Sequence, residues 1–447
     1  GISGMPSYLD DVLEADYILA FGTDPYAAYP VLFNRIVEAK RRGAKLICIE
    51  DAFNNTLPFA DEVFRIRPAS HIFFALALSK LLGSSDKAYK DFLESLNIDE
   101  LCKGCGIERE NIERLAEEIK DKNVAILLGM ALTQSGFGTE SILALTNLAI
   151  QLNASFIPMR GKVNVQGAGD MFCRPIRDGM PSTFFFYSDS IKFYFIMDSN
   201  PIKSFPNSER VKERLEKAFT VYMGPFMNES AYASKLILPG TILVEEEGTV
   251  TSAERRIRKV NQVSKPPSGK TNLEILLELA KELGIRIPAK NWKDVWNMIK
   301  ENVPSHSKAM IEGFADKKIR WKRLIPIYPR ERKFRGFILT TRRSIYHFTT
   351  AELSMHSETL KKIAPEPFVL MNPEDIKELG IKEEVIIRSS IDELKAKVRP
   401  NKLVARKFVV APFHYSSLPI NRLIPLSIEP ISFEPNLKYV EVDIIPV

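Results

Sequence analysis

Cysteine is the residue type in this chain whose spacing most directly suggests metal or redox chemistry. Cys102 and Cys105 form a CxxC pair in the segment LCKGCGIERE, and the chain has four cysteines in all. A structural zinc site needs about four ligands, and neither a second pair nor a nearby histidine accompanies this one. We therefore predict two cysteines in a loop before a helix. A disulfide of the kind found in thermophilic proteins is the alternative.

Two polar turns form the second candidate site, because each follows a short apolar run. Residues 17–30 read YILAFGTDPYAAYP, and residues 193–206 read FYFIMDSNPIKSFP. Both pass from a strand-like run into a polar turn, a proline and a second proline five residues later. We interpret the pair as an internal repeat of a nucleotide-binding unit. The alternative is that both segments share only the usual chemistry of strand–turn junctions.

The elements around the first turn alternate between strand and helix. Strands are predicted at 17–21, 45–50 and 124–128, and helices at 32–43, 70–82 and 139–152. The alternation then restarts, with strands predicted at 193–197, 219–223 and 236–238 and a helix at 273–283. This order predicts parallel sheets that helices cover on both faces.

After the basic, proline-containing segment 315–335, the predicted elements change from alternating strands and helices to mostly strands. Strand-like runs at 336–340, 384–388 and 407–410 indicate a β-rich barrel. We therefore predict four consecutive parts: a first α/β dinucleotide-binding domain at 1–160, a second at 161–305, a basic linker at 306–335 and a C-terminal barrel at 336–447.

Charge and hydropathy exclude several classes of protein. Lys and Arg number 62 against 56 Asp and Glu, a small excess that does not indicate nucleic-acid binding. No apolar run reaches about 18 residues, so no transmembrane segment is predicted. The segment GISGMPSYLDD lacks the features of a signal peptide. We expect a cytoplasmic location, with peripheral attachment to a membrane-bound complex left open.

Six further segments stand in a fixed order along the chain. They read PMRGKVNVQGAGDM (158–171), NESAYASKLILPG (228–240), EEEGTVTSAERR (245–256), LTTRRSIYHF (339–348), PEPFVLMNPEDIKELGI (365–381) and PFHYSSLPINRL (412–423). Together they resemble the molybdopterin oxidoreductase family, and the large subunits of formate dehydrogenases in particular. The resemblance implies an α/β fold with two related Rossmann-like parallel-sheet units, followed by a β-barrel that covers the cofactor.

The same resemblance implies a cofactor. The family binds two molybdopterin guanine dinucleotides around one Mo or W. Its metal-ligating cysteine or selenocysteine, and the cysteines of a [4Fe–4S] cluster, lie in a part that would precede Gly1, on a missing segment or a partner. The four cysteines present match none of these ligands. We therefore expect iron–sulfur and electron-transfer subunits as partners.

Carried over residue by residue, the resemblance implies a set of cofactor contacts. The two phosphate-side turns supply Gly22, Thr23, Asp24, Ser199 and Asn200, and Glu50 would bind the guanine. The active-site loop supplies Asn164, Gln166 and Asp170, and the pterin-contacting stretch supplies Thr341, Arg343 and His347. The remaining dinucleotide contacts are Phe413, Asn421 and Lys438. For His347, a purely structural role stays equally open.

Arg160 matches the family arginine that lies beside the metal and handles formate. Formate is a small carboxylate, and a guanidinium offers it planar, bidentate donors. Lys162, two residues later, stands where the family has glutamine and adds a second positive charge. An ordinary surface ion pair is the alternative for Arg160.

Other positions depart from the family pattern. Asp24 replaces an asparagine beside a phosphate, where an unpaired carboxylate should repel the ligand. His71 replaces an acidic residue that binds guanine, and Arg342 replaces a glycine beside the pterin. Two functions therefore compete. One is a catalytic core that oxidises formate with partner subunits, favoured by the retained loop RGKVNVQGAGDM. The other is a cofactor-free scaffold, like the similar domain in the large iron–sulfur subunit of respiratory complex I, favoured by the lost guanine contacts.

Overall fold

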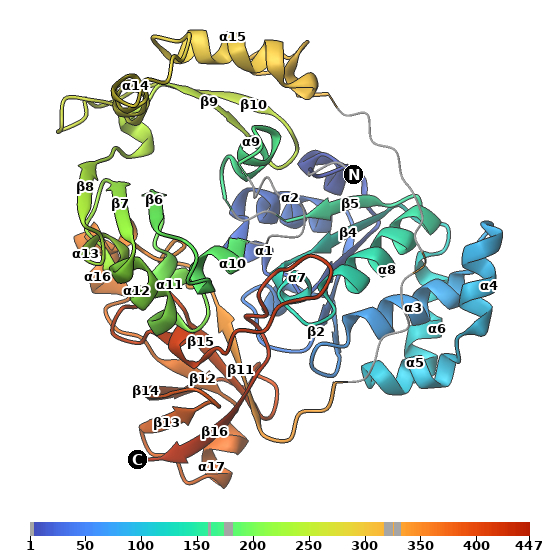
Figure 1. Ribbon diagram of the computed structural model, residues 1–447. Coiled ribbons are helices and arrows are strands. Elements are labelled where there is room, and N and C mark those ends of the chain that lie inside the picture. Colours follow the sequence, from blue (N-terminus) through green and yellow to red (C-terminus); the bar gives the residue numbers. More distant parts are fainter. Residues whose placement is uncertain (1–3, 160–161, 174–181, 317–324, 326–331) are drawn as a thin grey trace. The chain divides into compact units, whose positions relative to one another are not determined.

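Two compact units make up the chain. Figure 1 shows the computed structural model, which describes residues 4–159, 162–173, 182–316, 325 and 332–447. The large unit joins Ser7–Met159, Lys203–Ser208 and Trp321–Val447, and the small unit joins Gly1–Pro6, Arg160–Ile202 and Glu209–Arg320. The four consecutive parts expected from the sequence are a different, finer division, which stays a prediction.

A five-stranded parallel sheet forms the α/β part of the large unit, in the order β3-β2-β1-β4-β5. Its strands are β1 (Tyr17–Phe21), β2 (Lys45–Glu50), β3 (Glu62–Arg65), β4 (Val124–Leu128) and β5 (Ser155–Pro158). All residues of β1 and β4 are buried, as expected for strands covered on both faces. The chain leaves β1 toward β2 on one side and later adds β4 on the other. The carboxyl end of β1 is therefore a switch point, where open α/β sheets bind ligands.

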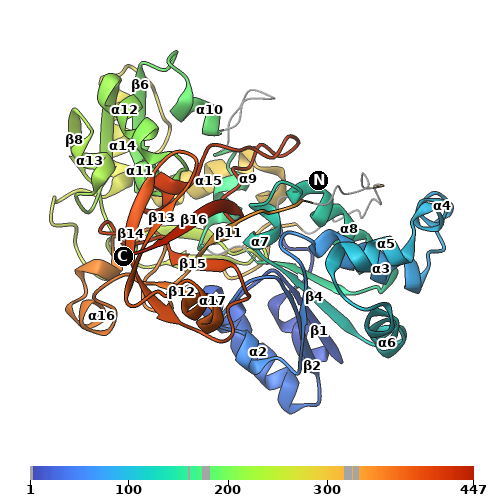
Figure 2. The same ribbon diagram turned by 90° about the horizontal axis from the view of Figure 1, so that it is seen from below.

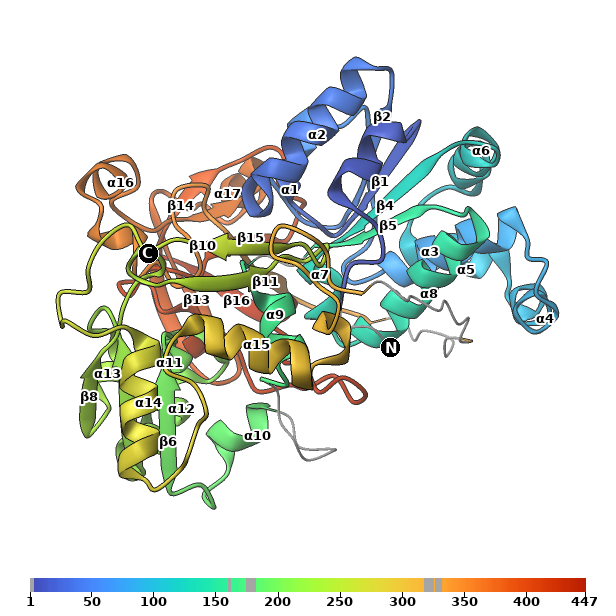
Figure 3. The ribbon, with the colours of Figure 1, turned by 90° about the horizontal axis from the view of Figure 1, so that it is seen from above.

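Helices cover both faces of this sheet. Helix α2 (Pro30–Arg41) lies on one face, and α3 (His71–Leu82) and α8 (Gly138–Gln151) lie on the other (Figure 3). Residues 71–79 of α3 are all buried, because further helices enclose it. The remaining helices of this part are α1 (Pro25–Ala28), α4 (Lys87–Ser95), α5 (Ile98–Cys105), α6 (Arg109–Ile119) and α7 (Met130–Thr133), with 3-10 turns at Leu9–Glu14 and Leu57–Phe59.

The CxxC pair lies inside helix α5, so the prediction of a loop before a helix is wrong. Asn97 begins this helix by accepting hydrogen bonds from the backbone N–H groups of Asp99 and Glu100. Cys102 and Cys105 are both buried free thiols. Burial raises the pKa of Cys105 to about 12, so this thiol is held in its unreactive, protonated form.

A closed six-stranded barrel completes the large unit (Figure 2), in the order β11-β15-β12-β14-β13-β16. The strands are β11 (Phe337–Arg342), β12 (Val369–Met371), β13 (Glu384–Arg388), β14 (Glu393–Pro400), β15 (Phe408–Pro412) and β16 (Val440–Pro446), with helices α16 (Glu358–Ile363) and α17 (Pro373–Glu378) and 3-10 turns at Ser354–His356 and Ile420–Leu423. Leu339, Val385 and Val409 are fully buried in its core. The predicted α/β class with a C-terminal barrel is confirmed.

The small unit holds a second, smaller parallel sheet of β6 (Phe193–Met197), β7 (Phe219–Gly224) and β8 (Leu236–Pro239). An antiparallel pair, β9 (Gly248–Thr251) and β10 (Ile257–Val260), lies apart from it. The helices are α9 (Val165–Asp170), α10 (Ser182–Tyr187), α11 (Pro201–Ser204), α12 (Ser208–Lys217), α13 (Glu229–Tyr232), α14 (Asn272–Glu282) and α15 (Trp292–Asn302), with 3-10 turns at Leu243–Glu245 and Pro304–His306. Across the described residues of both units, no helix has the length and apolar character needed to cross a membrane.

The barrel core makes a first prediction about stability. Leu339 is fully buried on β11, whereas Leu426 is 38% exposed. Leu339→Ala removes buried methyl groups and leaves a cavity, so it should lower the free energy of unfolding by about 2–5 kcal/mol. Leu426→Ala should change it by no more than about 0.5 kcal/mol. Urea unfolding followed by near-ultraviolet circular dichroism measures both. Equal transition midpoints for the two variants would contradict this account of the core.

Candidate cofactor site

The turn after β1 has a backbone that only glycine suits. Gly22 has φ +52°, and a Cβ there would lie 2.4 Å from Leu132 Cδ1 and 2.9 Å from Ala131 Cβ. Its N–H donates to the carbonyl of Ile49 at 3.2 Å. The turn is thereby held against the end of β2, and it has no space for a side chain.

Glu50 closes this turn from the neighbouring strand. Its Oε1 accepts a hydrogen bond of 2.7 Å from the backbone N–H of Thr23. The hydroxyl of Thr23 donates to the sulfur of Met159 at 3.1 Å, and its carbonyl accepts from Asn54 at 3.1 Å. The backbone N–H of Thr23, a residue that the resemblance places in a phosphate-side turn, therefore bonds to Glu50 in this structure.

Asp24 points into the loop that follows β2. Its carboxylate accepts hydrogen bonds from the backbone N–H of Ala27 (3.3 Å), from the backbone and side chain of Asn55 (3.0 and 2.7 Å) and from the hydroxyl of Thr56 (2.8 Å). These donors stabilise its negative charge locally. The expectation of an unpaired carboxylate beside a phosphate was therefore wrong in this respect: Asp24 is well supplied with donors.

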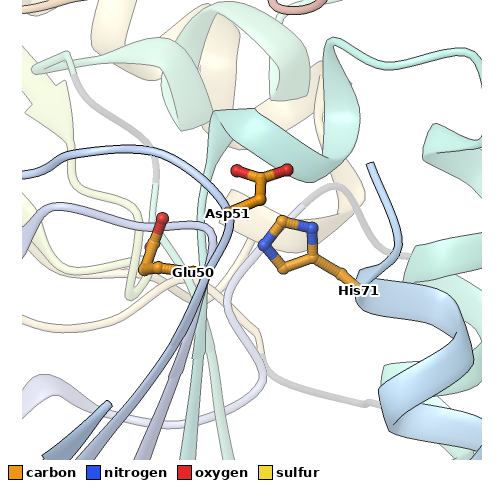
Figure 4. A group of neighbouring side chains, drawn as sticks. All are labelled: Glu50, Asp51 and His71. Carbon is orange, nitrogen blue, oxygen red and sulfur yellow. The ribbon is translucent and has the colours of Figure 1, made fainter. Parts of the chain in front are cut away.

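Glu50, Asp51 and His71 converge at the carboxyl edge of the sheet (Figure 4). All three are buried, with 4%, 3% and 2% of their surfaces exposed. Burial, reinforced by the charge of Asp51, raises the pKa of Glu50 well above its ordinary value. Burial lowers the pKa of His71, so its imidazole is neutral. The sequence analysis singled out Glu50 and His71 separately and missed Asp51.

On the barrel, basic side chains gather around the end of β11. Lys438 donates to the carbonyl and the hydroxyl of Thr341 at 2.6 and 3.0 Å. Part of the lysine side chain is exposed, but protein surrounds its ammonium group. Burial and the charge of Arg343 lower the pKa of Lys438 to about 8. Burial likewise lowers the pKa of Arg342 and of Arg343.

Two histidines of the barrel differ in their hydrogen bonding. His347 is buried, and its ring nitrogens lie 3.1 Å from the hydroxyl of Ser354 and 3.1 Å from the carbonyl of Ala364. His414 is fully buried, yet both of its ring nitrogens have no partner. The geometry therefore favours the structural alternative for His347 and makes His414, which the sequence analysis did not select, the open donor and acceptor here.

Other predicted contacts of the large unit lie near these groups. The ring of Phe413 packs edge-on against His414, with centroids 5.4 Å apart. Asn421 is buried and donates to the carbonyl of Lys203 at 2.7 Å. It thereby ties the barrel to the segment Lys203–Ser208, so its amide N–H serves the fold.

The second polar turn belongs to the small unit. Ser199 is exposed after β6, and Asn200 is buried. The amide of Asn200 donates to Glu229 at 2.6 Å and accepts from the hydroxyl of Ser230 at 2.8 Å. These bonds link β6 to α13. Of the two residues predicted to contact the cofactor, Ser199 is therefore the more accessible to a ligand.

Residues 162–171 of the loop RGKVNVQGAGDM surround a left-handed asparagine. Asn164 has φ +63° at the start of α9, and its Oδ1 accepts from the N–H of Thr251 at 2.9 Å. Gln166 is fully buried and donates to Asp170 at 2.7 Å. Lys162 is exposed. Arg160 lies outside the described residues.

Comparison with known proteins identifies the family. Residues 4–282 match the family model described as Molybdopterin oxidoreductase, and residues 337–441 match the one described as Molydopterin dinucleotide binding domain. The first match alone spans more than half of the chain.

The chain belongs to the molybdopterin oxidoreductase family.

Similar proteins cover almost the whole of this chain. The F420-dependent formate dehydrogenase subunit alpha of Methanocaldococcus jannaschii is 26% identical, over 99% of this chain and 78% of the relative. Formate dehydrogenase H of Escherichia coli is 23% identical, over 100% of this chain and 75% of the relative. The acetylene hydratase of Pelobacter acetylenicus has the same fold, with a TM-score of 0.80 at 13% identity over 99% of this chain and 81% of the other.

The barrel side chains fit the anionic dinucleotide that the family binds. Lys438, Arg342 and Arg343 bring positive charge into a partly dehydrated region, and no described carboxylate pairs with Lys438 or Arg342. His414 adds one unpartnered donor and one unpartnered acceptor. A phosphate-containing ligand would compensate the first three groups, and a polar heterocycle would satisfy the fourth. The residues present therefore fit the group.

The buried lysine makes a prediction about pH. The pKa of Lys438 is about 8 in the folded chain, against about 10.4 when unfolded. Between these values the unfolded state binds more protons, so stability should rise with pH across this window. Between pH 7.5 and 9.5 we expect the rise attributable to Lys438 to be about 2 kcal/mol and to vanish in Lys438→Met. Urea unfolding of both proteins at pH 7.5 and 9.5 measures the difference. Parallel profiles for the two proteins would contradict the buried-ammonium assignment.

Proposed function

We propose that this chain is the cofactor-binding core of a molybdopterin oxidoreductase of the formate dehydrogenase type. It would bind two molybdopterin guanine dinucleotides with Mo or W and oxidise formate to carbon dioxide. The large unit carries the proposal: Lys438, Arg342 and Arg343 bring positive charge to the end of β11. Glu50 acts on Lys438 and Asp24 acts on Arg342, but among the described residues neither carboxylate forms an ion pair with them. The names of the relatives support formate as the substrate.

Arg160 and Lys162 would bind the substrate. A guanidinium can hold the formate carboxylate through two parallel hydrogen bonds, and the ammonium of Lys162 adds a second positive charge. Held in this way, formate loses its C–H hydrogen as a proton and two electrons, leaving carbon dioxide. The molybdopterin centre, when bound, supplies the acceptor for those two electrons.

Partner subunits follow from the same proposal. The M. jannaschii relative is named as a subunit. In the described part of the small unit, β6 is an edge strand, and Phe193, Met197 and Phe219 of this sheet are 56%, 39% and 51% exposed. An open, apolar strand edge is a common place for another chain to pair. Iron–sulfur and electron-transfer subunits would provide such a chain and the path for electrons.

A cofactor-free scaffold is the second candidate function. The observation that favours it is the bond from the Thr23 N–H to Glu50, since it occupies a donor and an acceptor expected to contact the dinucleotide. Asp24 and His347 are similarly satisfied by neighbouring protein groups. A scaffold would need these bonds and no ligand.

Cofactor content separates the two functions. Native complex should contain about one Mo or W and release guanine nucleotide on denaturation. Arg343→Ala should reduce both by at least about tenfold, because a charged donor to a phosphate is worth roughly 1.5–3 kcal/mol. Arg388→Ala is the matched control, since Arg388 lies on the barrel surface and pairs with Glu393 at 2.8 Å. Metal analysis and nucleotide chromatography provide the readout. Native complex that holds neither metal nor guanine nucleotide would establish the scaffold instead.

Formate kinetics test the substrate. Arg160→Ala should lower kcat/KM for formate by at least about tenfold, corresponding to about 1.4 kcal/mol of lost transition-state binding. Arg160→Lys should recover only part of the loss, because an ammonium cannot reproduce the planar fork. Formate-dependent viologen reduction by the intact complex measures this. Unchanged kinetics in Arg160→Ala, with full metal content, would rule out this loop as the formate site.

A further inference from the structure

Strand β8 forms an open edge of the small parallel sheet. In the described part of the chain, β8 pairs with β7 alone, so its other side has no neighbouring strand. Figure 1 and Figure 3 both show β8 as the outermost strand of this sheet. The opposite edge of the sheet is β6, so the two edges can be occupied independently.

The backbone groups of β8 that face the open side follow from its bonds to β7. The N–H of Lys235 donates to the carbonyl of Thr220 on β7 at 2.9 Å. Successive residues of a strand direct their backbone groups to opposite sides, so Ile237 also faces β7, whereas Leu236 and Leu238 face outward. Within the described part of the structure, the outward groups of these two leucines bond to no other element. They are the donors and acceptors that an edge strand offers to another strand.

The side chains along this edge are apolar and accessible. Leu236 and Ile237 point to opposite faces of the sheet, yet they are 46% and 42% exposed. Tyr232, which ends α13 shortly before the strand, is 76% exposed. Apolar side chains and unpaired backbone groups therefore occur together on β8, and this combination favours pairing with another strand.

Charge does not protect this edge. Strand β8 contains no charged residue. The ammonium of Lys235, directly before the strand, donates to the carbonyls of Glu216 and Ala218 at 3.2 and 2.8 Å, at the end of α12. This lysine is therefore bonded within its own unit and does not repel an incoming strand. Pro239 ends β8 and limits further pairing to the residues before it.

We propose that β8 pairs with β8 of a second copy of this chain, antiparallel and around a two-fold axis at Ile237. In this register Ile237 lies opposite Ile237 of the second copy, and Leu236 lies opposite Leu238. The outward N–H and C=O groups of the two leucines then bond to each other on both sides of the axis. The two three-stranded sheets join into one continuous sheet.

A two-fold contact requires a surface that is complementary to itself, and β8 meets this requirement. Each apolar side chain at 236–238 lies opposite another apolar side chain, and Lys235 lies opposite Pro239, so no like charges face each other. A register centred on Leu236 would place Lys235 opposite Ile237. A register centred on Leu238 would bring Pro239 into the ladder. The register centred on Ile237 is the one that uses both outward leucines of each copy.

The inference does not rest on the proposed function. It concerns β8, whereas the proposed partner subunits would cover β6, and its test requires neither cofactor nor formate. A strand of a different polypeptide is the competitor for the same edge. Such a strand would give no symmetric contact between two copies of Ile237, so cross-linking separates the two ideas.

The first test is the mass of the full chain, measured by light scattering after size exclusion over a range of concentrations. The unaltered chain should approach twice its mass of 50.7 kDa as its concentration rises. Ile237→Lys and Ile237→Glu should each raise the dissociation constant of the dimer at least about tenfold, because they place like charges opposite each other. An equimolar mixture of the two variants should dimerise again, because opposite charges then meet.

Val263→Lys is the matched control. Val263 belongs to the same unit, lies outside β8 and is 82% exposed, so this variant should dimerise like the unaltered chain. Near-ultraviolet circular dichroism checks that every variant is folded.

The second test is disulfide cross-linking in a Cys173→Ser background, since Cys173 is the exposed cysteine. Residues opposite each other in a non-hydrogen-bonded pair have Cα atoms about 4.5 Å apart, within the range of a disulfide. Ile237→Cys should therefore cross-link two copies under mild oxidation. Leu236→Cys should not, because the two copies of residue 236 lie diagonally, beyond the limit of about 7 Å.

Three results would overturn the proposal. The unaltered chain could stay monomeric at every concentration. Folded Ile237→Lys could dimerise as well as Val263→Lys, or Leu236→Cys could cross-link as fast as Ile237→Cys. A complex in which another polypeptide protects β8 from hydrogen exchange, without an Ile237→Cys cross-link, would overturn it in favour of that polypeptide.

Discussion

Glu50 and Asp51 lie side by side at the end of β2, where burial removes the water that would otherwise solvate their carboxyl groups and raises the pKa of Glu50. Much of the large unit is arranged around them. The N–H of Thr23 bonds to Glu50 and orders the turn after β1, while Tyr439 brings a barrel hydroxyl to Asp51. The pair of carboxyl groups therefore connects the sheet, the first polar turn and the barrel.

Charge of the opposite sign gathers on the barrel. Lys438, Arg342 and Arg343 are partly dehydrated, as the lowering of their pKa values indicates. If these groups simply neutralised Glu50 and Asp51, the site would be closed to charged ligands. Lys438 instead bonds to Thr341, so positive and negative groups remain available for separate partners.

Local hydrogen bonds explain why some residues expected to contact the cofactor are instead bonded to neighbouring protein groups. Asp24 was expected to repel a phosphate, but Asn55 and Thr56 supply its carboxylate with donors. His347 stood in the more suggestive motif, yet its ring is satisfied, and His414 has the unpartnered nitrogens. A motif specifies which residue types are present. It does not specify which of their donors and acceptors neighbouring groups have already taken.

Strand and helix order could be read from the sequence, because apolar runs and their spacing record how each element is buried. The runs at 17–21 and 124–128 form the fully buried strands β1 and β4, and the strand-like runs after residue 335 form the closed barrel. The cluster of Glu50, Asp51, His71 and Tyr439 could not be read in this way. Asp51 and Tyr439 are 388 positions apart, and their hydrogen bond exists only because folding brings β16 beside the edge of the sheet. Sequence periodicity carries information about burial along one element, whereas a site assembled from several elements depends on how those elements pack.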